Sequence, residues 1–240
     1  MNAIAKPLPI ENDLDAHYIG LPFGLGPMPT VFHFSLSAKD SLNLDPFNQP
    51  VAALDIGKMR IMSVTLPFHE DFPPLPENAT EKWNKSNFEP FCLKLKQLLD
   101  ELIKEDMIDP DKIAFMGLSR GAFVAFHMAT LFPQVKGVLA FAPMLNLAQD
   151  PSLDVTPLAK DLCHLPIRIY MGNRDKKTST KTAMHFILDL ADCAYDAKIR
   201  SAPIEMFVTP SLGHSGHGTA KKTFIEGANW IYNLIIDNDE

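Results

Sequence analysis

A serine framed by two glycines is the first group in the sequence that could do covalent chemistry. Residues 117–121 read G-L-S-R-G, the pattern G-x-S-x-G, between an apolar stretch at 112–116 and an apolar helical pattern at 120–132. In a tight strand-to-helix turn, Gly117 and Gly121 leave room where a Cβ would clash, and the Ser119 hydroxyl is held clear of the backbone. We interpret Ser119 as a nucleophile at the carboxyl end of a strand rather than as a solvent-exposed serine in a turn.

A serine hydroxyl is a weak nucleophile and needs a general base. The last apolar stretch, 204–208, is followed by a glycine-rich segment that holds His214 and His217. We predict His214 as the base because of its distance from the end of the strand, with His217 as the second choice. Two alternatives stay open: a metal-binding pair in the pattern H-x-x-H, which lacks a nearby third ligand, and two histidines exposed to solvent.

A carboxylate is expected to orient the base. Asp175 follows the apolar stretch 167–171, and the order Ser119, Asp175, His214 is the order that accompanies this kind of turn. In that role Asp175 would fix the imidazole tautomer and stabilise its positive charge. Asp175 could instead cap the helical segment that follows it, and Asp150 and Asp154 are the alternative carboxylates.

The segments that must position these residues alternate between two patterns. Short apolar runs predict strands that are buried on both faces, and apolar residues at helical spacing between them predict helices. This alternation predicts an α/β fold, in which a mostly parallel open sheet carries helices on both faces and binds ligands beyond the carboxyl ends of its strands. The predicted strands are 30–34, 59–66, 112–116, 137–141, 167–171 and 204–208, and the predicted helices are 88–108, 120–132, 180–195 and 223–236.

The remaining segments are less regular. The first thirty residues show no clear pattern, and the proline-rich residues 67–90 predict a long surface loop that could partly cover the site. About 25 residues separate the predicted strand that ends at 141 from the predicted strand that begins at 167, so a lid inserted there would be small.

Composition excludes several classes of protein. The chain has 240 residues, 46% of them hydrophobic, which is enough for a sizeable core and excludes a disordered chain. Its formal net charge of −7 argues against nucleic acids or anionic membranes as partners, since both are polyanions. Three widely spaced cysteines, Cys92, Cys163 and Cys193, predict free thiols in a reducing compartment. We find no signal peptide and no membrane span in the sequence, so we expect a soluble, cytoplasmic protein.

Three short motifs together resemble the α/β-hydrolase superfamily: F-M-G-L-S-R-G at 115–121, G-N-R-D at 172–175 and L-G-H at 212–214. Residues 108–121 are most similar to its small dienelactone-hydrolase and prolyl-oligopeptidase-like members, and the likeness covers about residues 28 to 236. It implies a single α/β-hydrolase domain at residues 28–240 that has a minimal lid. An N-terminal extension at 1–27 would precede this domain. It also implies a Ser-His-Asp triad, acyl-enzyme chemistry and no cofactor.

The sequence departs from this superfamily where a His-Gly pair usually helps to form the oxyanion hole. Here F-S-L-S-A stands at 34–38. The backbone N–H of Arg120 should supply one donor, and the second would come from Leu36 or Ser37. His69 lies where many members have a histidine that is structural or lines the site. We expect the Arg120 side chain to form an ion pair near the turn rather than to clamp the substrate.

These residues together predict a serine hydrolase, most simply a carboxylic ester hydrolase. It would act on a small-molecule ester, thioester or small amide through an acyl-enzyme on Ser119. The alternatives are a serine peptidase of the prolyl-oligopeptidase-like type and a non-catalytic binding protein with the same fold. The intact Ser, Asp and His favour the enzyme. The sequence does not predict the acyl group, the leaving group or the oligomeric state.

Overall fold

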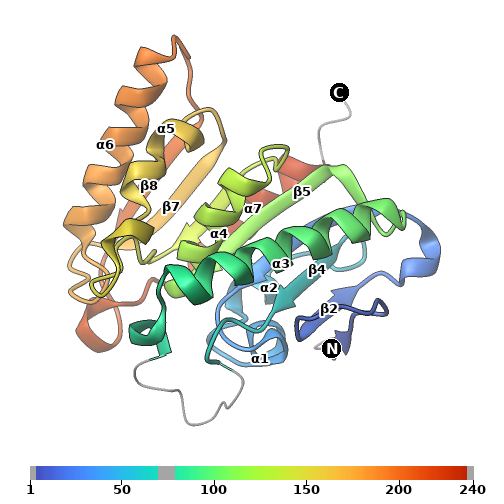
Figure 1. The fold of residues 1–240 in the computed structure, drawn as a ribbon. Coiled ribbons are helices and arrows are strands. Elements are labelled where there is room, and N and C mark those ends of the chain that lie inside the picture. The colour runs from blue at the N-terminus through green and yellow to red at the C-terminus, as the bar shows by residue number, and fades with distance from the viewer. Residues whose placement is uncertain (1–3, 70–78, 237–240) are drawn as a thin grey trace.

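The computed structural model describes residues 4–69 and 79–236. Its centre is an eight-stranded sheet in the order β1-β2-β4-β3-β5-β6-β7-β8 (Figure 1). The strands from β4 to β8 pair in parallel, whereas β1 and β2 add an antiparallel edge. The strands are β1 Lys6–Pro7, β2 Ala16–Gly20, β3 Met28–Phe34, β4 Arg60–Val64, β5 Ile108–Leu118, β6 Val138–Phe141, β7 Ile167–Gly172 and β8 Ile204–Thr209.

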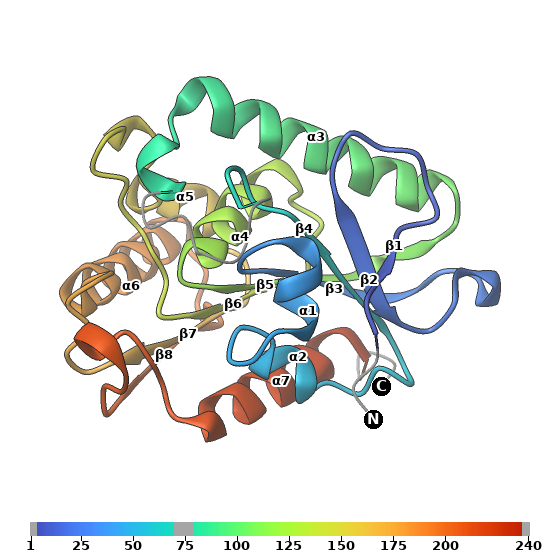
Figure 2. The same cartoon turned by 90° about the horizontal axis from the view of Figure 1, so that it is seen from below.

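Helices cover both faces of this sheet. Figure 2 shows α3, α4, α5 and α6 on one side of the strands and α1, α2 and α7 on the other. Each side has its own apolar core, so the sheet is buried on both faces. The helices are α1 Ala38–Asn43, α2 Gln49–Ala52, α3 Lys85–Lys104, α4 Arg120–Leu131, α5 Ala159–Leu162, α6 Thr180–Asp196 and α7 Lys221–Ile236. Short 3-10 turns lie at Phe23–Leu25, Ala79–Lys82, Pro151–Leu153, Thr156–Leu158 and His214–Gly216.

Helix α4 is the central helix. Most of its residues are buried, as the apolar pattern of its sequence predicts for a helix packed between the sheet and other helices. It begins directly after Ser119 and contacts β3, β5 and β6. Because strand β5 and helix α4 are both fixed by the core, the turn that joins them is held at the carboxyl edge of the sheet.

The predicted α/β fold class is confirmed. All six predicted strands and all four predicted helices are present, and the three cysteines are free. Two differences concern the irregular segments. The first thirty residues, whose sequence shows no clear pattern, contribute β1 and β2 to the sheet, and α3 begins at Lys85, inside the predicted loop 67–90. The part of that loop at 70–78 lies outside the described residues, so its predicted covering of the site is not tested.

In the described part of the chain, no helix is both long enough and apolar enough to cross a membrane.

Candidate active site

Ser119 lies on a strained turn between β5 and α4. Its φ of 56° and ψ of −113° are unusual for a residue with a Cβ. Hydrogen bonds hold the backbone there, since Ser119 N–H donates to the Phe141 carbonyl (2.8 Å) and its own carbonyl accepts from Met144 N–H (3.1 Å). The turn also requires glycine on both sides, because a Cβ on Gly117 would overlap the backbone of Ala122. Strain of this kind is typical of functional sites and presents the hydroxyl away from the backbone.

The other glycine of the motif is required by a neighbouring strand. A Cβ on Gly121 would overlap the carbonyl of Phe34 at the end of β3. The first turn of α4 therefore packs directly against the segment that follows β3. This close approach places the α4 N-terminus next to Phe34 and Ser35.

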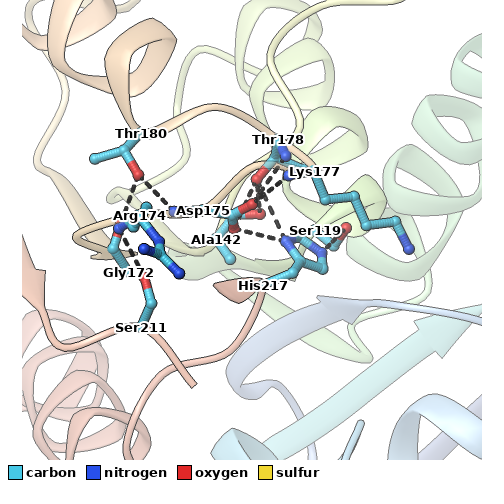
Figure 3. A network of polar contacts seen from close by, with 10 residues as sticks. All are labelled: Ser119, Ala142, Gly172, Arg174, Asp175, Lys177, Thr178, Thr180, Ser211 and His217. Carbon is cyan, nitrogen blue, oxygen red and sulfur yellow. Dashed lines mark hydrogen bonds and ion pairs between the residues drawn. The ribbon is translucent and has the colours of Figure 1, made fainter. Parts of the chain in front are cut away.

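Ser119, His217 and Asp175 form a continuous chain of hydrogen bonds (Figure 3). The Ser119 Oγ lies 2.8 Å from His217 Nε2, and His217 Nδ1 lies 2.7 Å from Asp175 Oδ2. Because a carboxylate only accepts, the Nδ1 of His217 carries a proton, and in the neutral imidazole Nε2 is left to accept from the serine hydroxyl. The arrangement can therefore activate Ser119 as a nucleophile.

Asp175 is held as a carboxylate. Its side chain is fully buried, and burial alone would raise its pKa. Hydrogen bonds reverse this effect: the backbone N–H of Thr178 (3.0 Å) and of Lys177 (2.8 Å) donate to Oδ1, and His217 and the Thr178 hydroxyl contact Oδ2. The net result is a pKa below the usual value. Asp175 therefore stays negatively charged beside His217 at neutral pH.

His217 is kept neutral in the resting site. Burial lowers its pKa below the ordinary 6.5, and the positive charges of Lys177 and Arg120 act in the same direction. The hydrogen bond and charge of Asp175 raise the pKa but do not overcome these effects. A neutral imidazole is the form that can accept the proton of Ser119.

The geometry corrects the prediction that His214 is the base. His214 is exposed and lies in the 3-10 turn, whereas His217 makes both contacts of the triad. The reason is the path of the loop. Gly213, Ser215 and Gly216 all have positive φ, and Leu212 N–H donates to the Gly218 carbonyl, so the loop folds back on itself. The fold-back brings residue 217 to the sheet edge and leaves residue 214 outside.

Two further predictions for these loops are resolved by the contacts. One is the metal-binding pair of His214 and His217. Both ring nitrogens of His217 already contact Asp175 and Ser119, so neither is available to bind a metal in this arrangement. The alternative carboxylates lie elsewhere: Asp150 accepts from Lys85 N–H and from Ser152, and Asp154 accepts from Asn146 and Leu147. Asp175 is thus the predicted carboxylate that the structure brings to the histidine.

The predicted oxyanion donors are placed only in part. Arg120 follows Ser119 at the first position of α4 and lines the cavity beside it. Leu36 also lines this cavity, but its N–H donates to the Ser41 hydroxyl (2.8 Å) and so is not free for a substrate. Ser37 is not among the described residues that line the cavity. Its hydroxyl instead caps α1 by accepting a hydrogen bond from Asp40 N–H. The prediction missed Ser35, which lines the cavity one residue earlier.

His69 is not among the residues that line the cavity, so of its two expected roles, site-lining and structural, the contacts support the structural one. It is buried, its Nδ1 lies 2.8 Å from the Pro67 carbonyl, and its Nε2 lies 2.8 Å from Arg120 Nη1. Trp83 packs beside it and donates to the same carbonyl. His69 therefore anchors the loop after β4 and holds the Arg120 side chain. Arg120, expected to form an ion pair, pairs instead with this histidine, and no described carboxylate contacts it.

A cavity of about 380 Å³ opens beside the Ser119 hydroxyl. It lies between the end of β3, the start of α4 and the loop that carries His217. Its volume fits a small ligand rather than a large one. The lining residues are Ser35, Leu36, Pro46, Phe47, Gln49, Leu118, Ser119, Arg120, Ala142, Lys177, Leu212, Gly213, His217, Gly218, Thr219 and Phe224.

Comparison with solved structures agrees with this fold, whereas the two sequence comparisons found no match. No family model matches the sequence, and no curated protein matches it. Among solved structures, the chain is similar to TT1662 from Thermus thermophilus, with 16% identity, a TM-score of 0.71 and coverage of 98% of this chain and 99% of that one. It is also similar to a sugar hydrolase from Lactococcus lactis, with 13% identity, a TM-score of 0.63 and coverage of 97% and 99%.

A third similar structure belongs to a longer protein. The acylaminoacyl peptidase of Pyrococcus horikoshii shares 13% identity with a TM-score of 0.64, over 98% of this chain but only 42% of that one. At such identities the likeness concerns the fold. The chain therefore has the α/β-hydrolase fold that its motifs predict, with the strained turn at the expected place.

Proposed function

We propose that the chain is a serine hydrolase that cleaves a small carboxylic ester through an acyl-enzyme on Ser119. The observation that carries this proposal is the hydrogen-bonded chain from Ser119 through His217 to Asp175 at the edge of a 380 Å³ cavity. A strained serine, a neutral histidine and an ionised, buried aspartate are the three parts that covalent ester hydrolysis needs.

The reaction proceeds in two steps. His217 Nε2 accepts the proton of Ser119 while Oγ attacks the ester carbonyl, and Asp175 stabilises the imidazolium that forms. The imidazolium then gives this proton to the leaving alcohol as the C–O bond breaks and the acyl-enzyme forms. In the second step a water attacks the acyl group, gives its proton to His217, and the acid is released as Ser119 regains its hydrogen.

The negative oxygen of the intermediate needs two donors. The Arg120 N–H follows the nucleophile and supplies the first. Ser35 supplies the second, because it lines the cavity and its backbone nitrogen lies against the first turn of α4, next to Gly121. Each such donor contributes on the order of 2.7–4 kcal/mol to the transition state.

The test is labelling and turnover with and without the nucleophile. We expect a fluorophosphonate probe to label the wild-type protein and p-nitrophenyl esters of short acyl chains to be hydrolysed. Ser119→Ala should abolish both, with a loss of kcat of about 10⁴-fold or more, while the circular dichroism spectrum is retained. The alanine variant should unfold at nearly the same temperature, since alanine keeps the Cβ and the strained backbone of this turn and loses only the hydroxyl.

Three outcomes would contradict the proposal. Esterase activity that survives Ser119→Ala in a purified preparation would exclude Ser119 as the nucleophile. Hydrolysis of aminoacyl amides in preference to every ester would instead favour a peptidase that uses the same three residues. A protein that binds the esters without hydrolysing them would be a binding protein with this fold.

A further inference from the structure

The cavity beside Ser119 carries a positive charge in a negatively charged protein. Of its described lining residues, the two with permanent charge are Arg120 and Lys177, and none is a carboxylate. The chain as a whole has a formal net charge of −7. A concave site lined by one sign of charge concentrates ligands of the opposite sign. The local charge at this cavity is therefore opposite to that of the molecule.

The charge of Arg120 is not neutralised by its partner. A guanidinium can only donate, so the 2.8 Å contact from Arg120 Nη1 makes His69 Nε2 the acceptor. His69 then carries its proton on Nδ1, which donates to the Pro67 carbonyl (2.8 Å), and the ring is neutral. Within the described chain no carboxylate pairs with Arg120. Its positive charge is half-buried next to the nucleophile, and among residues 4–69 and 79–236 its side-chain partner is the neutral His69.

Lys177 approaches the same cavity from the opposite loop. Its backbone N–H donates to Asp175 Oδ1 (2.8 Å), so the start of its side chain is fixed by the triad itself. In Figure 3 the side chain runs from the Asp175 loop toward the side of the cluster on which Ser119 lies. The side chain is exposed and forms no ion pair with any described carboxylate. It is positioned to meet a charged group on a ligand that has reached Ser119.

The charges of both cations act on His217, whose ring contacts the Ser119 hydroxyl. Lys177 and Arg120 each lower the pKa of His217 through their charge. Lys176, the preceding residue of the loop, is exposed and does not line the cavity. The neighbouring lysines therefore differ in the direction they face.

We propose that Lys177 and Arg120 form an anion subsite beside Ser119, and that the substrate is a small ester that also carries a carboxylate group. This inference rests on the proposed function and names the substrate class for that site. Lys177 determines specificity by meeting the carboxylate at the mouth of the cavity, and the charge of Arg120 adds to the attraction from within. The carboxylate is on either the acyl or the leaving-group side, which the following experiment separates.

The experiment compares charged and neutral esters of matched size. The acyl pair is the 4-nitrophenyl monoester of glutaric acid and 4-nitrophenyl 5-methylhexanoate, and the leaving-group pair is 4-acetoxybenzoate and its methyl ester. For each pair, the measured quantity is kcat/KM of the charged ester divided by kcat/KM of the neutral ester. In the pair whose carboxylate reaches Lys177, we expect Lys177→Met to lower this ratio about fivefold relative to the wild type, the upper range for the loss of one exposed ion pair. Lys177→Glu should lower the ratio by about a further fivefold.

The control is Lys176→Met, which removes the same charge from the neighbouring position and should keep the wild-type ratio. Raising the ionic strength from about 0.02 to 0.5 M should lower the ratio in the wild type and much less in Lys177→Met. A ratio that is the same in wild type and Lys177→Met, with the esters still hydrolysed, would overturn the anion subsite alone. A protein that hydrolyses none of the four esters and is not labelled at Ser119 by a fluorophosphonate would overturn the proposed function and this inference with it.

Discussion

At the scale of the residue, the histidine that contacts Ser119 is the one on which turnover depends. His217 contacts both Ser119 and Asp175, whereas His214 is exposed and makes neither contact. We expect His217→Ala to lower kcat by about 10⁴-fold or more, because Ser119 loses its base. His214→Ala should keep kcat within about twofold, as surface substitutions away from a site usually do. The measurement is kcat at saturating ester for both variants beside the wild type.

The opposite result would be informative. Normal turnover in His217→Ala together with collapse in His214→Ala would mean that the loop of residues 209–218 takes another path in solution. Equal losses in both variants, with retained circular dichroism spectra, would point to a role for His214 that its exposed position does not suggest.

The protonation of His217 makes activity depend on pH in a definite direction. Burial and the nearby cations lower its pKa below 6.5, so the neutral, active form persists to lower pH than for a free histidine. Activity should rise with pH, with its midpoint below 6.5. Asp175→Asn removes the interactions that raise this pKa, so the midpoint should move further down, while kcat falls by roughly 10²–10⁴-fold because the wrong tautomer is permitted.

The measurement is kcat/KM against pH for the wild type and for Asp175→Asn. Asp154→Asn is a matched control, because it is the same change on a carboxylate that does not contact His217. An upward shift of the midpoint in Asp175→Asn, or a wild-type midpoint above 6.5, would contradict the proposed balance of burial and charge around His217.

At the scale of the element, the sequence predicts the strands and helices that have a periodic pattern of apolar residues. Strands buried on both faces and helices with apolar faces produced clear patterns, and the predicted runs became β3 to β8, α3, α4, α6 and α7. The G-x-S-x-G motif predicts its own geometry, because the close contacts at Gly117 and Gly121 are properties of the turn. Ser119 and Asp175 stand within a few residues of strand ends, so strand prediction was sufficient to bring them together.

Loops without a periodic pattern could not be predicted in the same way. The choice between His214 and His217 depends on three residues with positive φ, Gly213, Ser215 and Gly216, which together reverse the chain. A sequence shows that glycine permits a positive φ but not that Ser215 adopts one. The engagement of Leu36 by Ser41 and of His69 by Arg120 depends on contacts between segments distant in the chain, which no local pattern encodes.

At the scale of the whole molecule, the N-terminal segment is joined to the sheet more closely than an extension would be. Strand β2 pairs with β4, and the Arg60 side chain of β4 is fully buried. Its guanidinium donates to the carbonyls of Leu21 (2.9 Å) and Pro22 (2.6 Å), and it lies 4.5 Å from the centre of the Phe23 ring. A buried cation must have its hydrogen bonds satisfied. The first 27 residues therefore supply partners that the rest of the sheet needs.

This dependence predicts the outcome of truncation, and it tests whether residues 1–27 are a separable extension. A chain that begins at residue 28 loses two of the carbonyls that accept from Arg60 and exposes the edge of β4. Hydrogen bonds to a charged group contribute about 1.5–3 kcal/mol each, and in a chain of this size about 1 kcal/mol corresponds to roughly 2–4 °C. We expect the Tm, followed by circular dichroism, to fall by at least about 10 °C.

Removal of residues 1–4 is the control, since Ile4 is 79% exposed and the Tm should stay within about 2 °C. A truncated chain with the Tm of the full-length protein would show that Arg60 is satisfied without this segment, and residues 28–240 would then be the complete folding unit.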